Sequence, residues 1–173
     1  MEMNIRRVSV TDCASLSNLA KRAFYETFTG TCTFDDMQFF LEENFNETKL
    51  EKEIDDEMNQ YYFAEVDGIL AGYILFSEDY KSLPVMKQWK ALELKRIYVL
   101  KTFYGQGIAQ KLMEVILDHA GKEQYKAIWL GVWEHNTRAQ RFYEKYGFTQ
   151  SGYTHDFPIG NTPQKDLWLW KFL

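Results

Sequence analysis

A chain of 173 residues with 46% hydrophobic and 17% aromatic residues can bury a substantial core, which excludes a disordered protein. The net charge of -5 and the scattered lysines and arginines exclude the basic patch of a nucleic-acid-binding protein. The longest apolar run, Ala127 to Trp133, is too short for a membrane span, and Met1 to Val10 lacks the apolar core of a signal peptide, so we expect one cytoplasmic domain over residues 1–173 without a membrane partner.

The first third of the chain is predicted to form a short strand followed by three helices. The strand covers Asn4 to Val8, and Thr11 or Asp12 is expected to cap the first helix. Its apolar side chains recur at helical spacing: Leu16, Leu19, Ala20, Ala23, Phe24 and Phe28. Gly30 to Thr33 breaks this helix. Two more are predicted roughly at Phe34 to Phe45 and Glu47 to Met58, with Asn46 as the cap between them.

The middle of the chain contains a strong hairpin signal. Two β-rich runs, Tyr61 to Val66 and Ile69 to Phe76, flank the turn dipeptide Asp67-Gly68. Ser77 to Lys90 is predicted as a surface loop, and Ala91 to Val99 as the next strand. A glycine-containing loop then leads into a helix from Gly107 to Ala120 that Gly121 is expected to end.

The last third begins with a strand that is apolar almost throughout, Ala127 to Trp133, as expected of a central position in a sheet. A helix from about Thr137 to Tyr146 follows. The last two strands, Phe148 to Phe157 and Leu167 to Leu173, are joined by a turn around Gly160-Asn161. This order predicts an α/β (α+β) fold with one mixed, mostly antiparallel seven-stranded sheet and helices on both faces.

The cysteines, histidines and acidic residues carry weaker signals. Cys13 and Cys32 form no Cys-x-x-Cys pair, and no histidine is near enough to complete a ligand set, so we expect free thiols and no metal. Acidic residues gather in the N-terminal half. They form a solvated surface or, in the alternative interpretation, a negative field that attracts a cationic substrate.

The loop Tyr104-Gly105-Gln106-Gly107-Ile108-Ala109 is a candidate anion site. The first N–H groups of a helix have no intrahelical partner, and the helix dipole favours negative charge there. Glycine lets a phosphate approach the backbone without meeting a Cβ atom. The loop has neither the Gly-Lys-Ser/Thr ending of a Walker motif nor the spacing of a dinucleotide fingerprint.

Asn136 and Tyr143 are seven residues apart and therefore share one face of the predicted helix. Each has a structural interpretation beside a functional one. Tyr143 continues an apolar stripe with Ala139, Phe142 and Tyr146, and Asn136 can be a helix N-cap. A buried tyrosine hydroxyl still needs a polar partner.

Leu94 to Ala109 and Asn136 to Phe148 together resemble the two signature motifs of the GNAT (Gcn5-related) N-acetyltransferase superfamily. Gly107 and Ala109 match its Gln/Arg-x-x-Gly-x-Gly/Ala pyrophosphate motif, but Tyr104 stands where Gln or Arg is usual. A narrower resemblance is to the bacterial PaiA-type spermidine/spermine N-acetyltransferases. It rests on three segments: Glu26 to Phe28, Leu92 to Val99, and Ile128 to Glu134.

The resemblance implies a GNAT-type domain with a splay between the fourth and fifth strands, where acetyl-CoA binds as co-substrate. Its pantetheine would pair with the strand at Ile97 and Val99, and its pyrophosphate would meet the loop amides. Lys101, Lys111 and Lys145 remain alternatives for the ribose phosphate. The implied cofactor-binding residues are Ile97, Tyr98, Val99, Tyr104, Gly105, Gln106, Gly107, Ile108, Ala109, Asn136, Tyr143 and Lys145.

The implied chemistry is direct attack of a primary amine on the thioester in a ternary complex. Glu93 would remove the proton of the amine, unless it is only a surface carboxylate that balances Lys95. Tyr143 would protonate the departing thiolate.

The implied acceptor is a small cationic amine, most simply a polyamine. The candidate acceptor-binding residues are Tyr25, Phe28, Trp133, Glu134 and Asp156. Another amine (an amino acid, an aminoglycoside or a peptide N-terminus) and a non-catalytic CoA-binding sensor are the alternatives. The aromatic content is compatible with a homodimer.

Overall fold

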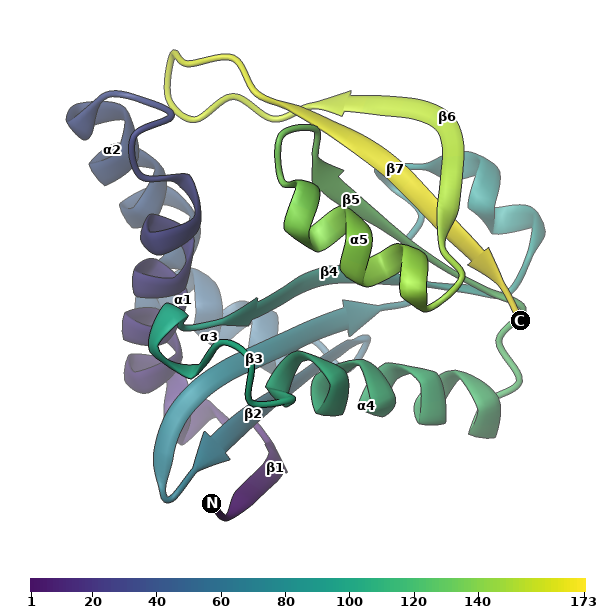
Figure 1. The fold of residues 1–173 in the computed structure, drawn as a ribbon, viewed down its shortest axis with the longest axis horizontal. Helices are drawn as coiled ribbons and strands as arrows, with labels where there is room; N and C mark the ends of the chain where they lie inside the picture. The colour runs from purple at the N-terminus through teal and green to yellow at the C-terminus, as the bar shows by residue number, and fades with distance from the viewer.

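Seven strands form one mixed sheet in the computed structural model, which describes residues 1–173 (Figure 1). The order across the sheet is β1-β2-β3-β4-β5-β7-β6, and every neighbouring pair is antiparallel except β4 and β5. The predicted sheet is therefore confirmed. The strands are β1 Met3–Arg7, β2 Asn59–Val66, β3 Ile69–Ser77, β4 Ala91–Val99, β5 Ala127–Trp133, β6 Thr149–Asp156 and β7 Lys165–Phe172.

Helices cover both faces of the sheet, each over its own apolar core. The helices are α1 Cys13–Phe28, α2 Phe34–Phe45, α3 Glu47–Asp55, α4 Ile108–Lys122 and α5 Thr137–Lys145. The first three pack on one face with Phe63 and Tyr73, whereas α4 and α5 pack on the other with Ala64 and Ile74. This division follows from the alternation of side chains along a strand. No helix is both long enough and apolar enough to cross a membrane.

The fourth and fifth strands separate half-way along their length, as the resemblance implies. They pair in parallel only from Ala91 with Ala127 to Leu94 with Leu130. At that point β4 contains a bulge, because Phe76 of β3 faces Leu94 and Leu75 faces Arg96, which leaves Lys95 as an extra residue. Beyond the bulge β4 has no partner on the side of β5. The sheet therefore opens into a splay.

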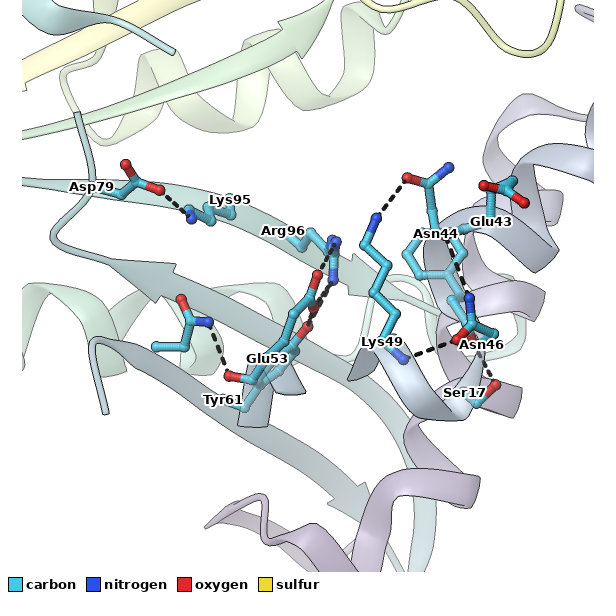
Figure 2. Close-up of polar contacts among 12 residues, drawn as sticks. Ser17, Glu43, Asn44, Asn46, Lys49, Glu53, Tyr61, Asp79, Lys95 and Arg96 are labelled. Atoms are coloured by element: carbon cyan, nitrogen blue, oxygen red, sulfur yellow. Dashed lines mark hydrogen bonds and ion pairs between the residues drawn. The ribbon is translucent and has the colours of Figure 1, made fainter. Parts of the chain in front are cut away.

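The bulge also directs two neighbouring cationic side chains to different partners. Lys95 reaches Asp79, with 2.8 Å between Nζ and Oδ2, whereas Arg96 reaches Glu53 of α3 and Tyr61 of β2 (Figure 2). The ion pair of Arg96 and Glu53 leaves 19% and 21% of the two side chains exposed. It joins α3 to the strand that forms one wall of the splay.

The tip of the β6–β7 hairpin folds back against α2 and closes one side of the splay (Figure 1). Asp36, in the first turn of α2, accepts hydrogen bonds from the backbone N–H of Asn161 and the hydroxyl of Thr162. The turn predicted at Gly160-Asn161 is present, and Gly160 has a positive φ of 57°.

Some predicted boundaries and caps are wrong. Asp12 precedes α1 but makes no side-chain cap, because its carboxylate pairs with Arg6, and the hydroxyl of Thr11 bonds Ser9 instead. The third helix ends at Asp55 rather than Met58, because the Asp56 carboxylate accepts the N–H of Met58 in a turn.

The end of α4 and the loop after β3 also differ from prediction. The fourth helix continues through Gly121 to Lys122 and ends where Gln124 takes a positive φ of 58°. The segment 77–90 is more than a surface loop, since it buries Leu83 and Met86 against Trp129 and Trp168.

Candidate active site

A cavity of about 700 Å³ occupies the splay and reaches both faces of the sheet. On one face its walls come from the loop before α4 and from α5, and on the other from α1 and α2. The second half of β4 forms a wall in between, with Ile97, Tyr98 and Val99. On its far side this segment pairs with β3, and on its near side it has no strand partner. An extended ligand chain can therefore lie along it.

The loop before α4 has the open backbone that an anion site requires. Gly105 and Gly107 both have φ of 80°, and no atom lies within 4 Å of the place that a Cβ atom would take on either. The first hydrogen bond of the helix runs from the N–H of Lys111 to the carbonyl of Gly107. The N–H groups of Ile108, Ala109 and Gln110 thus have no intrahelical acceptor and are available to a phosphate.

Two cations line the cavity beside this loop. The guanidinium of Arg138 lies over the ring of Tyr104, 3.5 Å from its centroid, and Lys101 also lines the wall. Lys111 pairs with Glu114 on the surface, and neither Lys145 nor Gln106 lines the cavity. Sequence reasoning missed Arg138, although its place in the first turn of the helix after Asn136 was a usable signal.

Asn136 and Tyr143 lie together at the cavity, one at the start of α5 and one near its end. The carboxamide oxygen of Asn136 accepts the N–H of Ala139, which confirms the N-cap interpretation. Tyr143 is 7% exposed and packs with Phe142 and Phe148, so it is also a core residue. Burial, helped by Tyr98 and Asp166, raises the pKa of Tyr143 above its usual value. Its hydroxyl therefore stays protonated at neutral pH.

Glu93 is neither exposed nor part of the cavity wall. Only 8% of the residue is exposed, and Lys95 pairs with Asp79 instead. The interpretation of Glu93 as a surface carboxylate that balances Lys95 is thus wrong. Burial raises the pKa of Glu93 to about 7, and Lys95 opposes this shift. A proton could pass from the cavity to this carboxylate only through an intervening group such as water.

Asp166 of β7 is the carboxylate that sequence reasoning missed. It lines the cavity and is half-buried, and burial alone raises its pKa to about 7. An acidic residue at the start of a C-terminal strand has no local pattern that marks it, so only its tertiary position identifies it.

The predicted acceptor-binding residues divide into two groups. Phe28 and Trp133 line the cavity with their ring centroids 5.2 Å apart. Glu134 and Asp156 are exposed and lie outside the cavity wall. Tyr25 lies one residue from the inward-facing Phe24 of α1, so it points elsewhere and lines a separate pocket of about 140 Å³.

Aromatic rings dominate the wall of the cavity beneath α1 and α2. Besides Phe28 and Trp133, the rings there are Phe24, Phe40, Phe45, Tyr98 and Phe157. The chain has no cluster of three or more His, Cys, Asp or Glu residues that could hold a metal ion, and both cysteines are free thiols.

A family model described as the acetyltransferase (GNAT) family matches residues 24–148, which include β4, the glycine-containing loop before α4, and α5. The chain belongs to the GNAT family. It is therefore an acyl-CoA-dependent N-acetyltransferase with acetyl-CoA as co-substrate. The open cradle at Gly105 and Gly107 and the unpaired wall of β4 fit this co-substrate.

Known proteins resemble this GNAT acetyltransferase to different extents. An uncharacterized N-acetyltransferase of Lactobacillus delbrueckii subsp. lactis is 36% identical over 172 residues, 99% of this chain and 98% of that protein. The spermine/spermidine N(1)-acetyltransferase of Bacillus subtilis (strain 168) is 30% identical over 94 residues, 53% of this chain and 58% of that protein. The PaiA N-acetyltransferase from Thermoplasma acidophilum, solved in complex with coenzyme A, has the same fold with a TM-score of 0.80, 21% identity and 100% coverage of both chains.

Proposed function

We propose that this GNAT acetyltransferase transfers the acetyl group of acetyl-CoA to a primary amine of a polyamine such as spermidine or spermine. The observation that carries the proposal is the cavity through the splay, which joins a phosphate cradle on one face to an aromatic chamber containing carboxylates on the other. The PaiA-type structural neighbour and the spermine/spermidine relative support the choice of a polyamine.

Acetyl-CoA enters this cavity from the side of α4 and α5. Its pyrophosphate accepts hydrogen bonds from the free N–H groups at the start of α4. Its pantetheine runs along the unpaired edge of β4 at Ile97 and Val99, so that main-chain groups of the strand hold it in register. Arg138, supported by Tyr104, and Lys101 supply positive charge for the phosphates.

Tyr143 donates a hydrogen bond to the departing thiolate. A thiol with a pKa of about 8.5 is a stronger acid than a phenol with a pKa of about 10, so the donated hydrogen bond supplies much of the stabilisation. The raised pKa of Tyr143 keeps the proton on its hydroxyl, so the hydroxyl remains a hydrogen-bond donor as the carbon–sulfur bond breaks. Positioning of the two substrates in one cavity supplies a further part of the rate.

The acceptor binds beneath α1 and α2. Aromatic faces attract an ammonium group and also cover the methylene segments of a polyamine. Two carboxylates line the cavity, Glu26 and Asp166. Glu26 already binds Arg22 and the backbone N–H of Lys101, whereas Asp166 has no partner within the chain. A cationic amine is the ligand that this arrangement accepts without leaving a buried carboxylate unpaired.

The release of CoA thiol across a panel of amines tests the proposal. The panel contains spermidine, spermine, putrescine, lysine, an aminoglycoside and a short peptide with a free N-terminus. We expect kcat/KM for spermidine and spermine to exceed the values for the other amines by at least about tenfold, which corresponds to about 1.4 kcal/mol of transition-state binding. Faster turnover of lysine, the aminoglycoside or the peptide would reject the polyamine and keep the acetyltransferase. Binding of acetyl-CoA without turnover of any amine would favour the sensor alternative.

A further inference from the structure

We infer that Asp166 binds the ammonium group of the acceptor and takes its proton before the amine attacks the thioester. The inference rests on the proposed function in that it requires a cationic amine, but it does not require a polyamine. It assigns to β7 the role that sequence reasoning gave to Glu93 of β4.

The sheet places Asp166 at the point where the splay opens. In the β5–β7 register, Asp166 lies opposite Trp133 and two residues from Trp168, which lies opposite Gly131. The Asp166 Oδ2 atom is only 2.9 Å from the position that a Cβ atom on Gly131 would take. Gly131 thus leaves room for the carboxylate between the strands, and both residues line the cavity.

The carboxylate has no internal counter-charge. No hydrogen bond or nearby cation of the chain stabilises its ionised form, and burial is the one cause of its raised pKa. A half-buried carboxylate without a partner lowers the stability of the fold. An ammonium ion in the cavity would remove this cost, so the site favours a cationic ligand over a neutral one.

Several titratable groups face Asp166 or share its cavity. Tyr98 of β4 and Tyr143 of α5 are near enough that Asp166 helps to raise the pKa of each. His155 of β6 lies opposite Asp166 in the β6–β7 register. The other titratable groups in the cavity wall are Glu26, Lys95, Arg96, Lys101, Tyr104, His135 and Arg138.

The carboxylate near the amine and the hydroxyl near the thiolate therefore differ in acidity. Asp166 titrates near neutral pH and is ionised above it, whereas Tyr143 keeps its proton well beyond that range. Groups whose environments separate their pKa values in this way are suited to opposite acid–base roles. Glu93 has a similarly raised pKa but lies outside the cavity wall, so it cannot contact the acceptor.

The protons balance as follows. Asp166 removes one proton from the ammonium, and the neutral nitrogen forms a bond to the thioester carbon. The carbon–sulfur bond then breaks. The second proton of the nitrogen passes to the sulfur as the thiolate leaves, and the Tyr143 hydroxyl stabilises this thiolate by a hydrogen bond while it keeps its own proton. Asp166 releases its proton to water after the products leave.

Asp166→Asn tests this role, because it keeps the shape and removes the charge. We expect kcat/KM for the amine to fall about 100-fold or more at pH 7, with an unchanged Kd for acetyl-CoA. Wild-type kcat/KM should level off above about pH 7, where Asp166 is ionised. The variant should keep rising toward the pKa of the amine, near ~10.4 for a lysine-like group, so the deficit shrinks at high pH. Asp118→Asn, an exposed acid on α4, is the matched control and should change nothing.

Two outcomes would overturn the inference. The first is a loss of less than about threefold, and the second is a deficit of the same factor at every pH, which indicates a structural defect. The ratio of wild-type to Asp166→Asn kcat/KM is measured with the amine that the wild type acetylates fastest. Failure of the polyamine proposal would appear in the ranking of amines by the wild type, and the effect of Asp166→Asn could still be measured.

A carboxyl ¹³C NMR titration provides a readout without turnover. The resonance that is absent from Asp166→Asn should titrate near pH 7 in the wild type. It should titrate at lower pH in the presence of CoA and spermidine, or of another amine from the panel, because an ammonium stabilises the carboxylate. A resonance that no amine shifts would reject the inference.

Discussion

The guanidinium of Arg138 lies over the ring of Tyr104 at 3.5 Å from its centroid and joins the start of α5 to the loop before α4. This contact gives a physical role to the tyrosine that stands where the superfamily usually has Gln or Arg. An aromatic face attracts a guanidinium and limits its rotamers. The positive charge is thus held beside the phosphate cradle, although it comes from a different element.

Arg138→Ala should weaken binding of CoA by about tenfold, the equivalent of about 1.4 kcal/mol for one charge-assisted hydrogen bond. Isothermal titration with CoA and with 3′-dephospho-CoA identifies the phosphate involved. If Arg138 binds the ribose phosphate, Arg138→Ala will lose much less affinity for 3′-dephospho-CoA than for CoA. Arg141→Ala, on an exposed position of the same helix, is the control. Equal affinities of wild type and Arg138→Ala for CoA would contradict the assignment.

Tyr143→Phe should lower kcat by about 100-fold or more, with KM for acetyl-CoA within about twofold of wild type. The hydroxyl acts on a thiolate that exists only as the bond breaks, so its removal affects the transition state rather than substrate binding. Tyr146→Phe removes a hydroxyl from the C-cap residue of the same helix, outside the cavity wall, and should be nearly neutral. An unchanged kcat/KM in Tyr143→Phe would remove the proposed role.

Glu93→Gln should stabilise the protein at pH 8 and have little effect at pH 4. The pKa of Glu93 is about 7 in the folded state against an ordinary value of 4.5, so between these values the folded state binds the extra proton. Stability therefore falls as pH rises through this window, by about 1.4 kcal/mol per pH unit and about 3 kcal/mol at most. Urea unfolding at several pH values measures the slope, and Glu57→Gln, an exposed acid, is the control. A pH-independent difference between Glu93→Gln and wild type would show that burial does not raise this pKa.

Glu53→Ala should lower the free energy of unfolding by about 3 kcal/mol, because it leaves the mostly buried guanidinium of Arg96 without its counter-charge. The Arg96→Leu/Glu53→Leu double variant should lose less free energy of unfolding than Glu53→Ala, since neither charge then remains. Glu51→Ala, exposed on the same helix, controls for helix propensity. Urea unfolding measures all three variants. A double variant less stable than Glu53→Ala would show that Arg96 keeps adequate solvation when it is alone.

Local chemistry made much of the fold predictable. The Asp67-Gly68 turn has φ of 49° and 80°, the conformation that this dipeptide predicts, and β2 and β3 pair on either side of it. Asn46 caps α3 through its side chain as expected. The element order also follows from patterns that lie within single segments. Each of these predictions depends on residues a few positions apart, where sequence and geometry are directly linked.

The parts of the site that prediction missed depend on residues far apart in the chain. Glu93 is buried, and Lys95, the extra residue of the bulge, pairs with Asp79. Arg138 is placed by a tyrosine from another loop. The place of Arg138 in the first turn of the helix after Asn136 is a local signal, but the contacts themselves leave no periodic or local pattern in the sequence.

By itself, therefore, the sequence determined the strands and helices, the glycine loop before α4 and the helix that carries Asn136 and Tyr143. Only the tertiary structure decided which carboxylate reaches the acceptor. Asp166 enters the cavity because β7 pairs with β5, where Gly131, the residue that faces Trp168, has no side chain to occupy the space of the Asp166 carboxylate. The pKa of a carboxylate is set by the desolvation and charges around it, and these come from strands that meet only when the chain folds.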